Sequence, residues 1–340
     1  MKRLFDHLIR SVYAQQTVKL ARASEQVDPL TDLIALLRPR AVLWKRLRGE
    51  GEWALRFAAN RDINFGTVLS GRCVLTGAGA PVELSQGDFL LLTAPAPFTF
   101  GSSDAVRPVD GDQALRGNDG TVVTIGSGPE AASVVAGHFV VDNVNSELLL
   151  ELLPGVLHLL SSSGAAGRMR VLLELLGDEA TAGRRGASLV TERLVEVMLV
   201  EALRDQPSAR RPGVAGLVGG LADPCVAAAL SALHSDVRRA WTVSDLATAA
   251  LTSRSVLAQR FTASVGVTPM HYLYAWRMAL AKDALIRSDA PVSQIAEQLG
   301  YHSLSAFSTA FKRHQALSPA RYRHSSTRGE RLAPVFRAPS

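Results

Sequence analysis

The spacing of the hydrophobic positions changes along this chain of 340 residues. From about residue 28 to residue 142, short apolar runs such as 89–92 and 122–125 alternate with Gly, Pro, Asn and Asp. This alternation is typical of antiparallel strands joined by tight turns, and it predicts a sheet that closes on itself as a barrel or jelly roll. The polar stretch 101–120 offers little to pack and predicts a long loop.

Beyond residue 146 the spacing becomes helical. Residues 147–160 predict one helix, which the Ser- and Gly-rich stretch 161–167 should end. Residues 187–203 predict a clearer helix, because apolar side chains recur there at i, i+4, i+7 and i+8. Its apolar faces are broad enough to pack on the sheet and on a second copy of the chain, so we expect a homodimer. Residues 206–220 are rich in Pro, Gly and Arg, and they predict a linker.

Everything after residue 222 predicts helices, and their starts carry capping residues. The expected caps are Asp223-Pro224, the capping-box pair Thr242 and Asp245, Thr268-Pro269 and Ser318-Pro319. The helix that follows Thr268 should be long and central. Its predicted buried side consists of Leu273, Trp276, Leu280 and Ala284.

This helical segment contains one short pattern twice, fifty residues apart. The first copy is Ser253, Leu257, Phe261, Thr268-Pro269 and Tyr272, and the second is Ser303, Phe307, Phe311, Ser318-Pro319 and Tyr322. Each copy predicts a helix-turn-helix unit, whose second helix is free to enter the major groove of DNA. We expect supporting helices at 243–250 and 292–299, and reader helices at 253–264 and 303–314. A repeated helical hairpin that binds protein is the competing interpretation.

The two reader helices should present different faces to DNA. The first face is Ser253, Arg254, Ser255, Ala258, Gln259 and Thr262, and the second is Ser303, Leu304, Ser305, Ser308, Thr309, Lys312 and Arg313. Arg and Gln make bidentate contacts to base edges, so the first unit should supply more direct base readout. The second should read shape and phosphate. The central helix is expected to place the readers in successive grooves about 34 Å apart.

The charge of the chain agrees with an anionic partner. The formal net charge is +6 and the pI is about 9.7. Nine Lys or Arg residues and four acidic residues lie from Trp241 to Arg323, so the excess is concentrated in the duplicated segment. No apolar stretch approaches the roughly 20 residues that span a bilayer, and no signal-peptide core follows Lys2-Arg3. A cytoplasmic location without membrane contact is therefore expected.

Two stretches carry a resemblance to a known family. They are WTVSDLATAALTSRSVLAQRFTASVGVTPMHYLYAWRMALAKDAL at 241–285 and VSQIAEQLGYHSLSAFSTAFKRHQALSPARYR at 292–323. Residues 223–323 resemble the DNA-binding domain of the AraC/XylS family of transcription regulators. The segments 28–41, 69–75, 84–100 and 193–204 resemble, more diffusely, a cupin-like sensor domain found in one branch of that family. Leu251 and Ala316 depart from the pattern, because glycine is common at both positions.

The resemblance implies an α+β protein of two domains, a cupin-like β-barrel with appended helices and an all-α domain with two helix-turn-helix units. The expected division is an N-terminal arm at 1–27, a sensor and dimerisation domain at 28–205, the linker at 206–220, a DNA-binding domain at 221–325 and a tail at 326–340. The implied partners are promoter half-sites in double-stranded DNA, RNA polymerase if the protein is an activator, an unknown small-molecule effector and a second copy of the chain.

Cupin-type catalysis is the first alternative to this assignment. Many cupins hold a metal with clustered histidines, but none of the eight histidines lies between residues 40 and 100, and Asn64 stands where one would be expected. The sequence also has no phosphate-binding glycine loop and no nucleophile motif. We therefore expect no enzyme activity, no metal and no cofactor, with a cupin-type enzyme fused to a DNA-binding domain as an alternative.

The first domain should also contain a pocket. Its aromatic residues Trp44, Trp53, Phe57, Phe65, Phe89 and Phe98 are the expected lining, and Trp44, Phe65, Phe89 and Phe98 are the expected contacts of the effector. Cys73 and Cys225 are too far apart in sequence to suggest a disulfide framework. A thiol-based redox regulator that uses these two cysteines is the other alternative.

Overall fold

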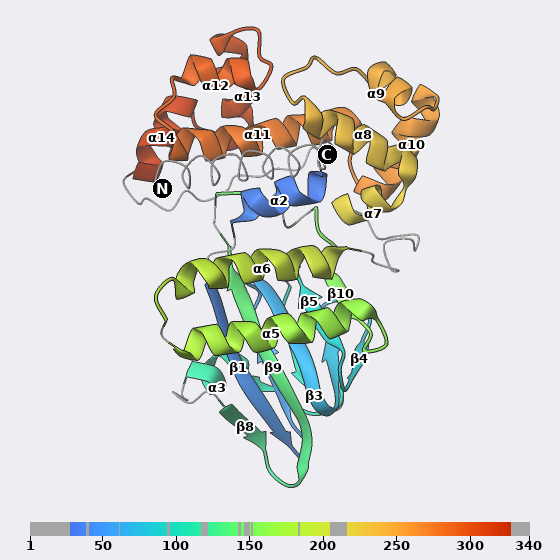
Figure 1. Cartoon of the computed structure of the whole chain (residues 1–340), viewed down its shortest axis with the longest axis vertical. Helices are drawn as coiled ribbons and strands as arrows, with labels where there is room; N and C mark the ends of the chain where they lie inside the picture. The colour runs from blue at the N-terminus through green and yellow to red at the C-terminus, as the bar shows by residue number, and fades with distance from the viewer. Residues whose placement is uncertain are drawn as a thin grey trace, which may run out of the picture.

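The computed structural model describes residues 28–38, 41–60, 62–93, 96–116, 122–141, 144–145, 150, 152–182, 184–204 and 216–327. A β-sheet domain with two long helices on one face lies below a purely helical domain, and helix α2 (Pro29–Leu37) lies between them (Figure 1). The predicted α+β organisation in two domains is confirmed. The N-terminal arm at 1–27 lies outside the described residues.

The sheet is a cupin-like half-barrel of ten strands. They are β1 (Ala41–Glu50), β2 (Ala54–Phe57), β3 (Ile63–Thr76), β4 (Val82–Ser85), β5 (Phe89–Leu92), β6 (Phe98–Gly101), β7 (Val109–Asp110), β8 (Val122–Gly126), β9 (Glu130–Val140) and β10 (Val156–Leu159). The strand order is β7-β2-β6-β3-β9-β1-β8. The long strand β3 pairs with β9 and β5 through its first half and with β4 and β6 through its second half. Sharing this strand folds the sheet around one interior.

Helices cover the sheet of the first domain and flank its edge. Helices α5 (Gly164–Ala182) and α6 (Ala187–Leu203) lie side by side across the sheet (Figure 1). Helix α6 has the predicted bounds and buries Val195, Met198 and Leu199. Helix α3 (Gly111–Arg116) is short and lies beside β2 and β7.

Two expectations for the first domain are wrong. The stretch 101–120 is not one long loop, because β7 and α3 form within it. Residues 156–159, the end of the helix expected at 147–160, form strand β10 instead. They pair with β5, where Leu157 lies opposite Leu91, so a long-range strand pairing determines their conformation. The expected linker is also shorter at its end, since α7 (Leu217–Ala222) begins inside it and buries Leu217 and Val218.

The second domain consists of helices whose bounds follow the sequence pattern closely. They are α8 (Pro224–Ser235), α9 (Val243–Ala249), α10 (Arg254–Val265), α11 (Pro269–Arg287), α12 (Val292–Gln298), α13 (Leu304–Gln315) and α14 (Pro319–Thr327). The predicted caps form: Asp223 accepts from the amides of Cys225 and Val226, and Thr242 and Asp245 make a capping box. Helix α11 runs along the domain, with α8, α9 and α10 near one end and α12, α13 and α14 near the other (Figure 1).

The buried side chains form three clusters. One fills the half-barrel and includes Trp53, Leu55 and Phe100. A second begins on the outer face of the sheet, continues through α2 and α6, and extends into α7 to α11. The third is confined to the far end of the helical domain, around Ile295, Phe307 and Phe311. The first domain therefore shares a core with the first helix-turn-helix unit and not with the second.

Candidate DNA-binding surface and ligand pocket

Helices α9 and α10 form the first helix-turn-helix unit. The hydroxyl of Ser253 accepts from the amide of Val256 at 3.4 Å, which caps the start of α10. Leu257 and Phe261 are fully buried and anchor α10 to the core, as the i, i+4 spacing predicts. The opposite face of α10 is therefore turned to solvent.

Helices α12 and α13 form the second unit in the same way. The hydroxyl of Ser303 accepts from the amide of Ala306 at 3.1 Å, and Phe307 and Phe311 are fully buried. The ring of Phe311 packs edge-on against Tyr322, with centroids 5.3 Å apart, which ties α13 to α14. The duplicated aromatic and tyrosine positions are thus structural anchors in both copies.

The structure leaves the predicted reading faces accessible. Exposed side chains are Ser253, Arg254, Ser255, Gln259 and Thr262 on the first unit, and Ser303, Leu304, Ser305, Thr309, Lys312 and Arg313 on the second, while Ala258 and Ser308 are half-buried. The charge of Arg260 is directed elsewhere, because its guanidinium lies 3.6 Å from the carboxylate of Asp223. On the first reading face, the positive charge is therefore that of Arg254.

The second reader carries positive charge only near its end. Lys312 and Arg313 lie there, and the guanidinium of Arg313 stands 5.4 Å above the ring of Tyr274, which fixes its direction. Burial and the nearby charges of Lys282 and His271 lower the pKa of His314 to about 4, so this residue is neutral at pH 7. The sequence did not reveal the stacking of Arg313, because Tyr274 lies on a different helix.

The two departures from the family pattern are both accommodated by left-handed backbone. Leu251 has φ 50 and Ala316 has φ 56, and glycine usually occupies this region because it lacks a Cβ. Leu251 is 94% exposed, so its side chain meets no neighbour that would exclude it. The equivalent Gly300 has φ 77, and a Cβ there would lie 2.1 Å from the carbonyl oxygen of Arg238. Glycine is therefore dispensable in the first turn and required in the second.

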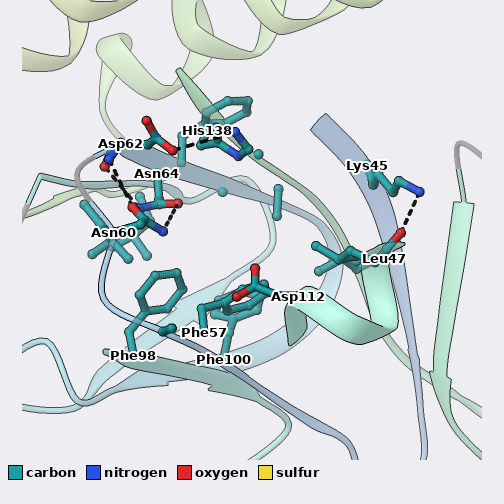
Figure 2. Close-up of a pocket in the computed structure, with 18 of the residues that line it drawn as sticks. Lys45, Leu47, Phe57, Asn60, Asp62, Asn64, Phe98, Phe100, Asp112 and His138 are labelled. Atoms are coloured by element: carbon teal, nitrogen blue, oxygen red, sulfur yellow. Dashed lines mark hydrogen bonds and ion pairs between the residues drawn. The ribbon is translucent and has the colours of Figure 1, made fainter. Parts of the chain in front are cut away.

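A pocket of about 610 Å³ opens in the half-barrel. Its aromatic wall comes from β2 and β6, where the rings of Phe57 and Phe98 stack at 5.0 Å beside Phe100. Figure 2 shows Asn60, Asp62, Asn64 and His138 together at a distance from this wall. A pocket of this size and composition fits a small organic molecule.

Only some of the residues that were predicted to line the pocket do so. Phe57 and Phe98 line the pocket, whereas the buried Trp53 does not. Phe65 is also a lining residue, but its ring stacks with Phe89 and Phe139 on the other face of the sheet. The prediction for Phe89 is wrong: Leu90 and Leu92 of the same strand line the pocket, and alternation turns Phe89 to the other face, where it stacks with Phe65. The side chain of Trp44 lies outside the described residues. Sequence reasoning missed Phe100, the polar group and helix α3, whose Asp112, Leu115 and Arg116 line the pocket.

The two cysteines lie in different environments. Cys73 is 1% exposed on β3, and burial together with the charge of Asp88 raises the pKa of its thiol to about 12. A thiolate is the reactive form, so this environment opposes redox sensing at Cys73. Cys225 is half-buried in the first turn of α8. Among the described residues, no three His, Cys, Asp or Glu side chains gather where they could hold a metal ion.

A cupin-like half-barrel joined to two helix-turn-helix units with exposed second helices is the architecture of a two-domain DNA-binding protein. Residues 28–206 match the Cupin family, and residues 246–325 match the family described as Helix-turn-helix domain. A putative AraC-like transcription regulator of Streptomyces lividans is 39% identical over 303 residues, which cover 88% of this chain and 99% of that protein. One of Streptomyces antibioticus is 38% identical over 299 residues, covering 87% and 98%. This chain therefore belongs to the AraC family of DNA-binding transcription regulators.

The helical domain is also similar to solved DNA-binding domains, of which one was crystallised with DNA. The DNA-binding domain of AdpA, crystallised with a target DNA, is 30% identical and covers 32% of this chain and 98% of its own, with a TM-score of 0.29. In the described residues, no helix is long and apolar enough to cross a membrane.

Proposed function

We propose that this regulator is a ligand-controlled activator in which α10 and α13 read promoter half-sites. The observation that carries the proposal is the pair of reader helices, each capped at its start, anchored by two buried side chains and exposed on the opposite face. Each start leaves backbone amides near the reading face, and such amides bind phosphate. Helix α11 joins the two units, so they can engage successive major grooves together.

In this proposal, α10 and α13 make different kinds of contact with DNA. Arg254 and Gln259 are exposed on α10 and have the donors that recognise guanine and adenine edges. Helix α13 offers the short hydroxyls of Ser305, Ser308 and Thr309, which approach the backbone and read its shape. Lys312 and Arg313 add phosphate contacts that do not depend on sequence.

Selection of binding sites from random DNA tests this division. Arg254→Ala and Gln259→Ala should each relax base preference within one half-site, at a cost of about 1–3 kcal/mol on the preferred sequence. Lys312→Ala should weaken binding to all sequences similarly and reduce the salt slope by about 1. Arg72→Ala, which removes an exposed charge from the distant strand β3, is the matched control and should change neither. Unaltered base preference in both α10 variants would refute the role of α10 as the principal reader.

The sensor half of the proposal rests on the pocket and on the helices beside it. A small molecule in the pocket would contact Phe57, Phe98 and Phe100, and its binding would change how the reader helices are presented to DNA. Helices α5 and α6 leave Val171 and Leu175, and Val190 and Val197, exposed at spacings that place each pair on one helix side. We propose that these faces pair two copies of the chain, and that the bound dimer recruits RNA polymerase.

The proposed division is a sensor at 28–204 and a DNA-binding domain at 216–327.

A further inference from the structure

The pocket has a polar end whose chemistry restricts what it can hold. Asn64 donates through its amide to Asn60 at 3.0 Å and to the backbone carbonyl of Asp62 at 3.2 Å. The Asp62 carboxylate lies 3.9 Å from His138, which balances its charge only when the ring is protonated. The amide of Asn60 donates in turn to the oxygen of Asn64 at 3.5 Å, so the two amides pair with each other and the charged acceptor at this end is the carboxylate of Asp62.

The remaining charges of the described lining lie away from that end. The ammonium of Lys45 donates to the carbonyl of Leu115 at 2.9 Å, and the Nε of Arg116 donates to the carbonyl of Asp112 at 3.2 Å. Figure 2 shows Asp112 beside the phenylalanine rings and Lys45 well separated from Asp62. Neither cation is placed to neutralise an anion at the polar end, and Asp62 would repel one.

We propose that the pocket binds an aromatic ligand whose head group donates hydrogen bonds and carries no negative charge. The ring packs against Phe57, Phe98 and Phe100, where offset and edge contacts favour another aromatic ring. The head group donates to Asp62 and to the amide oxygen of Asn64. This inference rests on the proposed sensor role of the pocket and names the chemical class of its effector.

A matched series with one ring system tests the class. The probes are 2-naphthalenemethanol, 2-naphthylmethylamine and 2-naphthoate, titrated into the full chain by calorimetry. The alcohol and the amine should bind at least tenfold more tightly than the carboxylate. Asp62→Asn should narrow that ratio severalfold, because it removes the charge that repels the carboxylate. Asp112→Asn, which removes an equal charge at the aromatic side, should leave the ratio unchanged.

Two outcomes would overturn this assignment. One is a carboxylate that binds as well as the alcohol. The other is a set of three probes that all fail to bind. DNA binding measured on the same preparations separates this failure from failure of the proposed function, because a chain that binds DNA but no probe is a regulator with a different effector.

A different observation concerns the path between the two domains. Asp32 of α2 accepts from Nδ1 of His234 at 2.7 Å, and Nε2 of the same ring lies 2.7 Å from the hydroxyl of Tyr272 on α11. The His234 side chain is fully buried, and Arg38 makes a two-point ion pair with Asp283 at 3.1 Å. Asp32 thus ties α2 to the first half of the DNA-binding domain, whereas Arg38 at the other end of α2 pairs with the last turns of α11.

The buried cluster that contains α2 also contains Phe65, a lining residue of the pocket. Asn64 and Phe65 line the pocket, and Phe65 stacks on Phe139 at 4.6 Å. Phe139 belongs to the buried cluster that includes α2 and extends to α10, whereas the core around Phe307 is separate. We infer that Asp32 of α2, through His234, transmits the state of the sensor to the first helix-turn-helix unit, while the second unit keeps its separate core and acts as a constant anchor on DNA.

Hydrogen exchange on the full chain tests this inference without any ligand. Asp32→Ala should lower amide protection at least tenfold in α8 and α10, and change protection in α12 and α13 by less than twofold. Thr31→Ala is the control on the same helix, because its exposed hydroxyl donates to Asp28 at the start of that helix. Equal loss of protection in both units, or no loss in α8 and α10, would contradict the inference.

Discussion

The two turns of the duplicated unit make a quantitative prediction about stability. Gly300 and Leu251 hold equivalent positions, with φ 77 and φ 50. A Cβ on Gly300 would lie 2.1 Å from the carbonyl oxygen of Arg238 and 2.8 Å from the guanidinium of Arg277. The left-handed region costs a residue with a Cβ about 1–2 kcal/mol, and forced overlap typically costs about 1–3 kcal/mol. Alanine loses about 0.5–1 kcal/mol less conformational entropy on folding than glycine, so Gly300→Ala should destabilise the chain by about 1.5–4 kcal/mol in total.

The matched change in the first turn should act in the opposite direction. Leu251→Gly relieves about 1–2 kcal/mol of backbone strain and loses about 0.5–1 kcal/mol to the greater freedom of glycine in the unfolded chain. The side chain is 94% exposed, so little apolar burial is lost. A net gain of about 0.5–1 kcal/mol follows. Urea unfolding followed by circular dichroism measures both variants, and a Leu251→Gly loss as large as that of Gly300→Ala would refute the reasoning.

Three further changes have predictable outcomes. Burial raises the pKa of Asp88, but hydrogen bonds from two backbone amides and from His158 outweigh it and hold that pKa below 3.8. The stabilisation from Asp88 is therefore present above about pH 4 and lost as the pH falls further, so Asp88→Asn should flatten acid unfolding in that window. Iodoacetamide at pH 8 should label Cys225 well before the buried Cys73, as mass spectrometry would show; equal rates would contradict the burial. Leu175→Glu should shift the chain from dimer to monomer in light scattering, and an unchanged mass would exclude α5 from the interface.

The helical domain was predictable because its signals are local. Caps, a capping box and i, i+4 anchors each lie within a few residues, and they placed the starts and ends of α9, α10, α12 and α13 within about two residues. Because the unit is duplicated, each of these signals occurs twice in the sequence. The same locality explains why the reading faces could be named, since burial of Phe261 and Phe311 determines which side remains exposed.

Most of the lining of the pocket and the contact between the domains were not predictable, because they depend on distant pairings. Strand β10 forms because Val156–Leu159 pairs with β5, and its sequence alone resembles the end of a helix. Aromatic residues mark a pocket in general, but only the register of each strand decides that Phe98 faces it and Phe89 does not. Asp32 and His234 are 202 residues apart and give no local signal of their contact.

Methylation interference tests the central claim most directly. Dimethyl sulfate marks guanines in the major groove, and the DNA would be a fragment recovered by genome-wide mapping of sites bound by the full chain. If α10 and α13 both read DNA from one face, interference should occur in two clusters about 10 base pairs apart. Arg254→Ala should abolish interference in one cluster only. A single cluster, or two clusters that both persist in Arg254→Ala, would contradict the account.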